Sequence, residues 1–214
     1  MNQSCIDCGV IACNRKNGVE PKPFPAFCPT PGLHEEMDPT SEVFEAAMKE
    51  YEDPQVKRIM VAAAEVEFEH YCKYTRVEEV MEFARKIGAK KLGVATCAGL
   101  IRESRMLARI LRANGFEVVG FSCKMGAVEK HTVGIPDSCE QIGCCMCNPI
   151  LQAKMLNAQK TDLNLVVGLC VGHDSLFMRY SEALVTTVVT KDRVLGHNPA
   201  AALYTAESYY KKLL

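Results

Sequence analysis

The chain has 214 residues, 12 of them cysteine, and 48% of its residues are hydrophobic while 24% are charged. Its net charge of −1 excludes a broad basic surface as the main means of binding, so we expect neither a nucleic-acid nor a membrane partner. No apolar run approaches the roughly 20 residues of a membrane-spanning helix, and the opening MNQSCIDCGV shows no secretory signal. We therefore expect a cytoplasmic protein whose cysteines serve metal binding or redox chemistry rather than structural disulfides.

The first 36 residues differ from the rest of the chain. They contain four cysteines and five of the ten prolines. Prolines at this density interrupt both helices and β-ladders, so something other than a core of its own must order this stretch. We predict two domains: a cysteine- and proline-rich metal-binding module over residues 1–36, and an α/β domain with N-terminal helices over residues 37–214.

Apolar residues at helical spacing predict three helices after this module. Thr75 and Glu78 form a capping box that starts the third helix, and Gly88 ends it. Cys72 stands apart from the other cysteines, and we expect it to be a core residue of the second helix. The three predicted helices cover residues 41–51, a segment from Pro54 to Tyr71, and residues 77–87.

Strand-like and helix-like segments alternate from there to the end of the chain. Strands separated by helices imply a parallel sheet with helices on both faces. We therefore predict an α/β fold with an open parallel sheet of about four strands. The predicted strands cover residues 92–96, 116–121, 163–169 and 184–190, and the predicted helices cover residues 101–113, 149–158, 175–182 and 200–213.

The N-terminal cysteines follow the spacing C-x2-C-x4-C-x14-C. A C-x2-C pair can turn two sulfurs toward one ion, and the other two cysteines can close a four-thiolate shell. Metal binding would also supply the folding free energy that a missing core cannot. We favour an iron–sulfur cluster over zinc, although the spacing alone does not separate them, and the alternative is four unrelated cysteines in an unstructured tail. The predicted metal ligands are Cys5, Cys8, Cys13 and Cys28.

Three further cysteines each follow a predicted strand: Cys97, Cys123 and Cys170. The carboxyl ends of parallel strands lie along one edge of the sheet, where open α/β folds bind their ligands. We therefore expect these thiols to converge on one functional site. The alternative is that each is a small buried hydrophobe next to a strand.

The segment SCEQIGCCMCNP brings four more cysteines (139, 144, 145 and 147) toward the N-terminus of the helix near Pro149, which tends to lower thiol pKa values. Adjacent Cys144 and Cys145 cannot easily ligate one small ion together, so we assign Cys145 a reactive role. His173 can act as a proton donor to a substrate, oriented by Asp174, or merely lie at a helix N-terminus. The predicted cluster ligands are Cys97, Cys123, Cys144, Cys147 and Cys170, and the predicted catalytic residues are His173 and Cys145.

The blocks KYTRVEEVMEFARKIGAKKLGVATCAGL, CNPILQAKMLNAQKTDLNLVVGLCVGHDSLF and KDRVLGHNPAAALY resemble a family of uncharacterised proteins of anaerobic bacteria and archaea. The N-terminal SCIDCGVIAC is similar to the opening of that family, which is described loosely as metal-binding. The resemblance covers nearly the whole chain and names no activity. It implies metal binding at the N-terminal cysteines and at a second site around the strand-end cysteines. An anaerobic source also favours iron–sulfur clusters over zinc.

The leading hypothesis is an iron–sulfur protein with two sites. The N-terminal site would be structural or would relay electrons, and the strand-end site would perform redox or sulfur-handling chemistry on a small molecule. Its expected partners are that small molecule or an electron-transfer partner. Two alternatives stay open: a zinc-stabilised thiol or persulfide enzyme, and a metal-storage or metallochaperone protein without catalysis.

Overall fold

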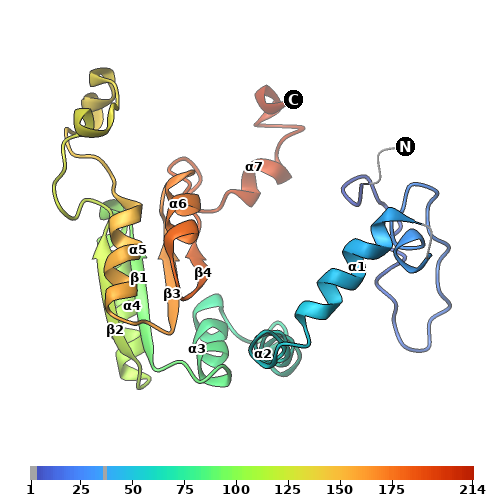
Figure 1. Ribbon diagram of the computed structural model, residues 1–214. Helices are drawn as coiled ribbons and strands as arrows, with labels where there is room; N and C mark the ends of the chain where they lie inside the picture. The colour runs from blue at the N-terminus through green and yellow to red at the C-terminus, as the bar shows by residue number, and fades with distance from the viewer. Residues whose placement is uncertain (1–3, 36–37) are drawn as a thin grey trace. The chain divides into compact units, whose positions relative to one another are not determined.

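A four-stranded parallel β-sheet lies at the centre of residues 62–214 in the computed structural model, which describes residues 4–35 and 38–214 (Figure 1). The chain divides into two compact units, residues 1–61 and 62–214. The domain boundary that the sequence predicts, between residues 36 and 37, lies outside the described residues.

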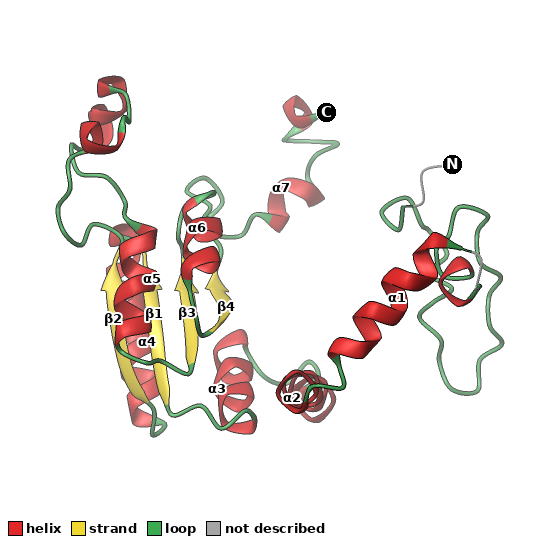
Figure 2. Ribbon diagram, viewed as in Figure 1, coloured by secondary structure: helices red, strands yellow, loops and turns green. Residues whose placement is uncertain are grey.

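The helices and strands follow one another as the sequence predicts, with short 3-10 helices (η) between them (Figure 2). The first unit holds η1 (Gly32–His34), α1 (Pro39–Glu50) and the start of α2 (Pro54–His70). The second unit continues α2 and adds α3 (Arg76–Lys86), β1 (Lys91–Thr96), η2 (Ala98–Leu100), α4 (Ile101–Ala113), β2 (Glu117–Ser122), η3 (Lys130–Val133), η4 (Asp137–Ile142), α5 (Pro149–Ala158), β3 (Leu163–Val167), α6 (His173–Tyr180), β4 (Leu184–Val189), α7 (Ala200–Tyr204) and η5 (Lys211–Leu213).

The strand order is β2-β1-β3-β4, and every neighbouring pair runs parallel. Alternate residues of β1 face the helices on its two sides. Ala95 clusters with Ala153 of α5, whereas the Thr96 hydroxyl accepts a hydrogen bond of 2.6 Å from Ser104 of α4. Helix α4 therefore covers one face and α5 the other, where α5 also packs against α6 (Figure 1). The predicted open parallel α/β sheet with helices on both faces is confirmed.

The two central strands are buried on both faces, which explains their nearly continuous apolar sequences. Their packing depends on one polar pair. Gly93 of β1 has no side chain, and a Cβ at this position would overlap Asn164 of β3. Asn164 is fully buried, accepts a hydrogen bond of 2.8 Å from the Thr161 hydroxyl and donates one of 2.8 Å to the Ser181 hydroxyl. A buried amide is thus satisfied on both sides, as burial of a polar group requires.

In the second unit, capping residues in the sequence correctly predict where α3 and α5 begin. The capping box between Thr75 and Glu78 is present at the start of α3, and Gly88 follows its end with a φ of 79°. Helix α5 covers the residues that the sequence predicts, with Asn148 as its N-cap. In the described part of the chain, no helix is both long enough and apolar enough to cross a membrane.

Two predictions from local patterns are wrong. The predicted terminal helix over residues 200–213 ends at Tyr204, and Thr205 directs its hydroxyl to the Ala201 carbonyl at 2.7 Å. Tyr204 is 84% exposed, so no core contact favours a longer helix. Cys72, expected in the core, is exposed in the turn after α2 with a φ of 56°. Helix α2 ends at His70, so Cys72 is not on the buried face of that helix.

The N-terminal segment has almost no core, as the sequence predicts. Of residues 4–35 only Ala12 is buried, and the only regular structure is the short η1 helix. His34 at the end of η1 packs edge-on against Phe44 of α1, with ring centroids 5.0 Å apart. Backbone turns shape the rest of the segment, so its order must come from another source of free energy.

Candidate functional site

The carboxyl ends of β1 and β2 bring Cys97 and Cys123 to the same level of the sheet. Thr96 pairs with Ser122 in the ladder, so the two cysteines follow the last paired residues of neighbouring strands. The Cys123 amide donates a hydrogen bond of 2.8 Å to the Thr96 carbonyl, and the Cys97 amide donates one of 3.1 Å to Val167 of β3. The backbone ladder itself therefore sets the positions of both residues.

Cys147 joins them from a distant part of the chain. The amide of Asn148 donates a hydrogen bond of 2.7 Å to the carbonyl of Cys123, and the Asn148 side chain caps α5 by accepting a bond of 3.0 Å from the Leu151 amide. Because Asn148 is held at both ends, Cys147 directly before it is placed beside Cys123. Both cysteines contact the core cluster between the sheet and α5.

The Cys123 and Cys147 thiols shift each other's pKa in opposite directions. A hydrogen bond from Cys123 lowers the pKa of Cys147 to about 5, helped by the charges of Lys124 and His173 and opposed by burial. The same hydrogen bond and burial raise the pKa of Cys123, although its sulfur also accepts a bond of 3.3 Å from the Ala98 amide. At neutral pH the pair therefore holds one proton, with the negative charge on Cys147.

Gln152 of α5 is fully buried and contacts the ends of the strands that carry Cys97 and Cys123. Its side-chain amide nitrogen donates to the Thr96 carbonyl at 3.0 Å and to the Phe121 carbonyl at 2.7 Å. One side chain thus ties the helix to the carboxyl ends of both strands, each within two residues of a cysteine. Its amide oxygen is buried without a hydrogen-bond partner among the described residues.

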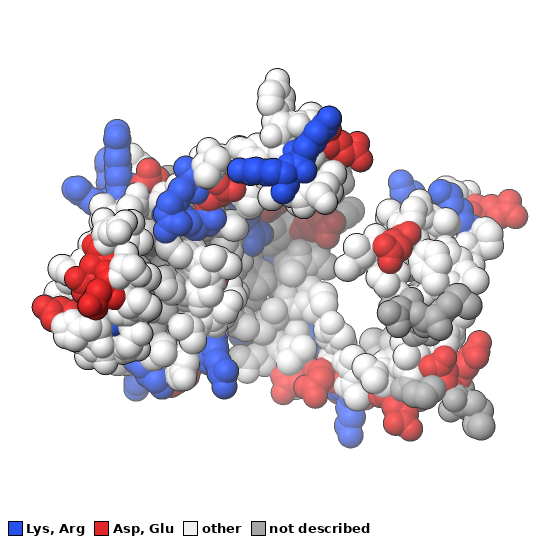
Figure 3. Space-filling model, turned by 90° about the horizontal axis from the view of Figure 1, so that it is seen from above, with Lys and Arg blue, Asp and Glu red and all other residues white. Residues whose placement is uncertain are grey.

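Two more cations border the site on the β3 and β4 side. The amine of Lys191 and the sulfur of Cys97 each lie 3.9 Å from the position that a Cβ on Gly99 would take. Arg193 donates a hydrogen bond of 2.8 Å to the sulfur of Cys170, which follows β3 on the other side of β1. Seen from the carboxyl side of the strands, basic and acidic side chains are mixed on this face (Figure 3). Cys170 therefore lies at the predicted edge of the sheet, and its sulfur contacts Arg193 there.

The loop between β2 and α5 holds the remaining cysteines. The sulfurs of Cys144 and Cys145 lie 3.9 Å apart, and this contact raises the pKa of Cys145. The Cys145 backbone is fixed by a bridge to Glu129 and by a hydrogen bond of 2.5 Å from the Lys124 amine to its carbonyl. Cys139 is exposed in η4. The roles assigned to Cys144 as ligand and Cys145 as catalytic residue stay predictions.

The N-terminal cysteines lie on turns that expose or half-expose their sulfurs. The Cys8 amide donates to the Cys5 carbonyl at 3.2 Å, which closes the C-x2-C turn. The Ile11 amide then donates a hydrogen bond of 3.4 Å to the Cys8 sulfur. Backbone donors to sulfur are typical second contacts of metal-bound thiolates. The other two predicted ligands are Cys13, on a turn to Arg15, and Cys28, on a turn from Pro25.

Tetrahedral zinc with bonds of about 2.3 Å requires ligand sulfurs about 3.8 Å apart. Among the described residues, the only three metal-ligand groups within 4.8 Å of one another belong to Glu69, His70 and Glu82. Both cysteine sets are therefore spaced more widely than one tetrahedral ion would hold them. Their thiolate donors are of the kind that bind zinc or iron–sulfur centres.

The group of Glu69, His70 and Glu82 was not predicted. It joins the end of α2 to α3, and Lys86 donates a hydrogen bond of 3.0 Å to Glu69. The His70 ring stacks on Tyr74 with centroids 3.7 Å apart. The Glu69 carboxylate is therefore already paired with the Lys86 ammonium group, and the group needs no metal ion to balance this charge.

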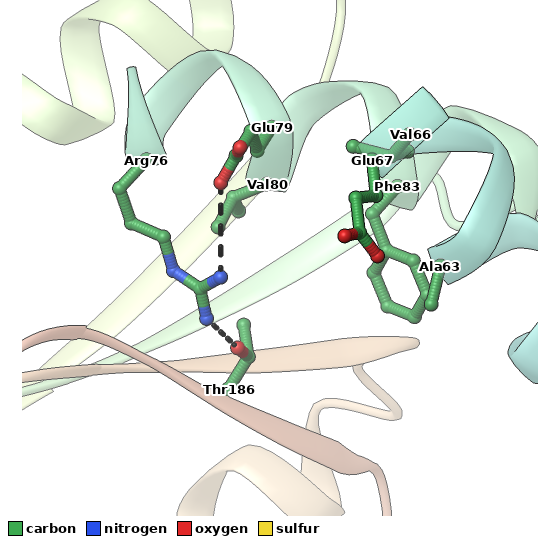
Figure 4. Close-up of a pocket in the computed structure, with 8 residues that line it drawn as sticks. All are labelled: Ala63, Val66, Glu67, Arg76, Glu79, Val80, Phe83 and Thr186. Atoms are coloured by element: carbon green, nitrogen blue, oxygen red, sulfur yellow. Dashed lines mark hydrogen bonds and ion pairs between the residues drawn. The ribbon is translucent and has the colours of Figure 1, made fainter. Parts of the chain in front are cut away.

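A hollow of about 360 Å³ lies between α2, α3 and β4 (Figure 4). Arg76 reaches across it to the Thr186 hydroxyl at 2.8 Å and lies 3.9 Å from Glu79. Phe83 and Glu67 line the other end (Figure 4). Because its arginine is already engaged, this hollow ties α3 to the edge strand and offers little to a charged ligand.

Sequence reasoning missed the residues that surround the thiols. Three of these residues could have been found from the sequence, because residues that follow parallel strands lie at the same carboxyl edge of the sheet. Lys124 follows Cys123, and two basic residues follow β4. Gln152 carries no such signal, since a glutamine in a helix most often faces solvent. The missed residues are Lys124, Gln152, Lys191 and Arg193.

Two comparisons with known proteins agree. The family described as a protein of unknown function, DUF1847, matches residues 35–188. A protein of Methanocaldococcus jannaschii, named uncharacterized protein MJ0455, is 42% identical over 177 residues, which cover 83% of this chain and 91% of that protein. The match to the family includes all of the strand-end cysteines.

Proposed function

The chain belongs to the DUF1847 family of proteins of unknown function, and from its site we propose that it binds an iron–sulfur cluster through thiolates at the carboxyl edge of its sheet. We assign this centre redox or sulfur-handling chemistry on a small molecule. The coarser property, a cysteine-rich protein with groups suited to metal binding, rests directly on the chain and its family.

One observation carries the proposal: Cys97, Cys123 and Cys147 come from three separate segments and meet at one edge. Backbone hydrogen bonds fix Cys97 and Cys123 on their strands and Cys147 on the helix cap. Chance burial of small hydrophobes would not require this convergence, because each thiol could be buried equally well elsewhere. Positioning by backbone is what a preorganised set of ligands needs.

The charges around the thiols support the same proposal. Several thiolates in one place repel one another, so they need nearby cations. Lys124 and His173 act on Cys147, Lys191 lies near Cys97, and Arg193 contacts Cys170. These cations would stabilise thiolates and offset the negative charge of a bound cluster.

A cluster bound at this edge would supply one-electron transfer or a site for sulfur exchange. The protein's own groups would do the rest. Cys170 follows β3 at the same edge and accepts a hydrogen bond from Arg193, so it would be the fourth ligand. His173 is half-buried at the start of α6 and acts on the charge of Cys147, so it can hold a proton for a substrate beside the centre.

The N-terminal cysteines form the second proposed site. Cys5, Cys8, Cys13 and Cys28 occupy a segment with a single buried residue, and the Cys8 sulfur already accepts a backbone hydrogen bond. A metal bound by the four thiolates would provide the free energy that orders this segment. Iron–sulfur is again the first choice, and zinc is the alternative.

A second function is favoured by the contact between Cys123 and Cys147. Two neighbouring thiols, of which one has a lowered pKa, can act as a redox pair without metal. Cys147 would attack a disulfide-bearing small molecule and release one thiol, and Cys123 would then displace the other. The pair is oxidised to one disulfide, and the substrate is reduced to two thiols. Zinc in the N-terminal module would complete this alternative.

The test is the iron, zinc and acid-labile sulfide content of protein purified without oxygen. We expect iron and sulfide in the wild-type protein, with loss of one cluster in Cys123→Ser and in Cys147→Ser. Cys8→Ser should remove the other cluster and leave the first. Cys72→Ser is the matched control, because Cys72 is exposed and apart from both sites.

Wild-type protein with zinc but no sulfide would overturn the cluster proposal and favour the thiol alternative. Equal loss of metal in Cys72→Ser and Cys123→Ser would show that the binding is not specific to the strand ends.

A further inference from the structure

A second hollow, of about 350 Å³, lies beside α4 on the outer part of the sheet. Its floor is formed by β1 and the edge strand β2, including Val94 and Val118. Gly120 of β2 also lines the hollow and carries no side chain. A Cβ at Gly120 would lie 3.1 Å from the carbonyl oxygen of Val94, so the floor is close-packed beneath it.

Three arginines of α4 line this hollow: Arg105, Arg109 and Arg112. They are four and three residues apart, so they stand on one side of the helix over about 10 Å of its length. Only Arg112 has a fixed partner, a hydrogen bond of 3.0 Å to the Val118 carbonyl. Helix α4 contains four arginines and one glutamate, although the whole chain has a net charge of −1.

These three cations are not neutralised. Within residues 4–35 and 38–214, no carboxylate lies within ion-pair distance of any of them. Three neighbouring positive charges that repel one another are unfavourable without a counter-charge. Arginine is also the side chain that grips planar or tetrahedral oxyanions through two parallel hydrogen bonds, which lysine cannot do.

We infer that the hollow between α4 and β2 binds a small multivalent oxyanion, with phosphoryl or carboxylate groups held by Arg105, Arg109 and Arg112. The volume falls in the range of small-molecule sites. The apolar floor of Val94 and Val118 would accept an uncharged part of the same ligand. Ser104 and Thr96 on the inner wall already bond to each other, so the charged recognition falls to the arginines.

The site is separate from the thiol centre. The arginines stand on the α4 face of the sheet, whereas Cys123 and Cys147 contact the core on the α5 face. The inference therefore holds whether or not a metal binds to the thiols at the strand ends. It makes the protein a binder of an anionic small molecule as well as a carrier of reactive thiols.

The test is calorimetric titration of the full-length protein with inorganic pyrophosphate and, in a second arm, with citrate. We expect saturable binding at one site and a roughly tenfold loss of affinity for each of Arg105→Gln and Arg109→Gln, since each removes one charge-assisted contact. Arg102→Gln is the matched control, because Arg102 lies on the same helix but does not line the hollow. It should leave the affinity within about twofold.

Tighter binding of pyrophosphate would identify a phosphoryl ligand, and tighter binding of citrate a carboxylate ligand. Arg109→Lys adds a further check, because it keeps the charge and should still weaken binding if the paired hydrogen bonds matter. Two results would overturn the inference: no saturable binding of either anion, or an equal loss of affinity in Arg102→Gln and Arg109→Gln. The arginines are exposed, so unfolding curves should confirm that all variants fold.

Discussion

The thiols of Cys123 and Cys147 lie together at one edge of the sheet and shift each other's pKa, although residues 124–146 separate them in the chain. The contact does not depend on the side chains alone. The Asn148 amide binds the Cys123 carbonyl at 2.7 Å, so the backbone brings the two cysteines together before any metal is bound. This preorganisation means that the pair should show its chemistry in the metal-free protein.

The first prediction concerns the reactivity of Cys147 in reduced, metal-free protein. Its pKa is lowered from 9.0 to about 5, chiefly by the hydrogen bond from Cys123, so the reactive thiolate forms as pH rises through that value. Alkylation of Cys147 by iodoacetamide should rise with a midpoint near pH 5 and level off at higher pH. Mass spectrometry of digested protein would follow each cysteine, with exposed Cys72 as internal reference.

The variant Cys123→Ala should move this rise to higher pH, because it removes the donor whose hydrogen bond is the largest cause lowering the pKa of Cys147. Alkylation of wild-type Cys147 that increases only near pH 9.0 would show that Cys123 does not stabilise the Cys147 thiolate.

The second prediction concerns Gln152, which ties α5 to the ends of β1 and β2. In Gln152→Leu two buried carbonyl contacts are lost, at Thr96 and Phe121. We expect a loss of about 1–3 kcal/mol in the free energy of unfolding, together with a lower metal content, because the strands that carry Cys97 and Cys123 lose their common anchor. Urea unfolding and metal analysis would measure both.

Gln159→Leu is the control for this change, because Gln159 is exposed just past the end of the same helix. Equal unfolding curves for Gln152→Leu and wild type would contradict the anchoring role.

The third prediction tests the close packing of the two central strands. In Gly93→Ala the new methyl group would overlap the Asn164 side chain and press on Leu156 at 3.0 Å. We expect a loss of about 1–3 kcal/mol, measured by urea unfolding. Gly99→Ala is the control, because its methyl group would meet its nearest atoms at an ordinary 3.9 Å. Equal free energies of unfolding for the two variants would contradict the close packing of Gly93 against Asn164.

The fourth prediction concerns removal of metal from the N-terminal module. Residues 4–35 bury only Ala12, so without bound metal they should lose order, whereas residues 62–214 should keep their core. Hydrogen exchange before and after treatment with a chelator would locate the change. Cys8→Ser should reproduce the effect of the chelator. Unchanged protection of residues 4–35 would contradict a metal-dependent module.

Much of the strand-end site follows from the sequence because it depends on strand ends. Cys97 and Cys123 come directly after apolar strands, and parallel pairing places such positions side by side. The Asn148–Pro149 pair marks the start of α5, which also places Cys147 at the same edge. Local signals were sufficient for these residues.

Other features depend on packing that no local pattern reveals. Cys144 and Cys145 turn toward each other because the loop is held by Glu129 and Lys124, which are distant in sequence. The meeting of His70 with Glu82 depends on how α2 and α3 pack. Helical periodicity alone extended the terminal helix too far, because exposed apolar residues resemble a buried face in sequence.

The most direct measurement is the anomalous scattering, at the iron absorption edge, of crystals grown from protein kept free of oxygen. We expect a strong peak bonded to the sulfurs of Cys97, Cys123 and Cys147 at the carboxyl edge of the sheet. A map with no metal density at that edge, from protein whose N-terminal cysteines do hold metal, would contradict the assignment of these thiols as ligands.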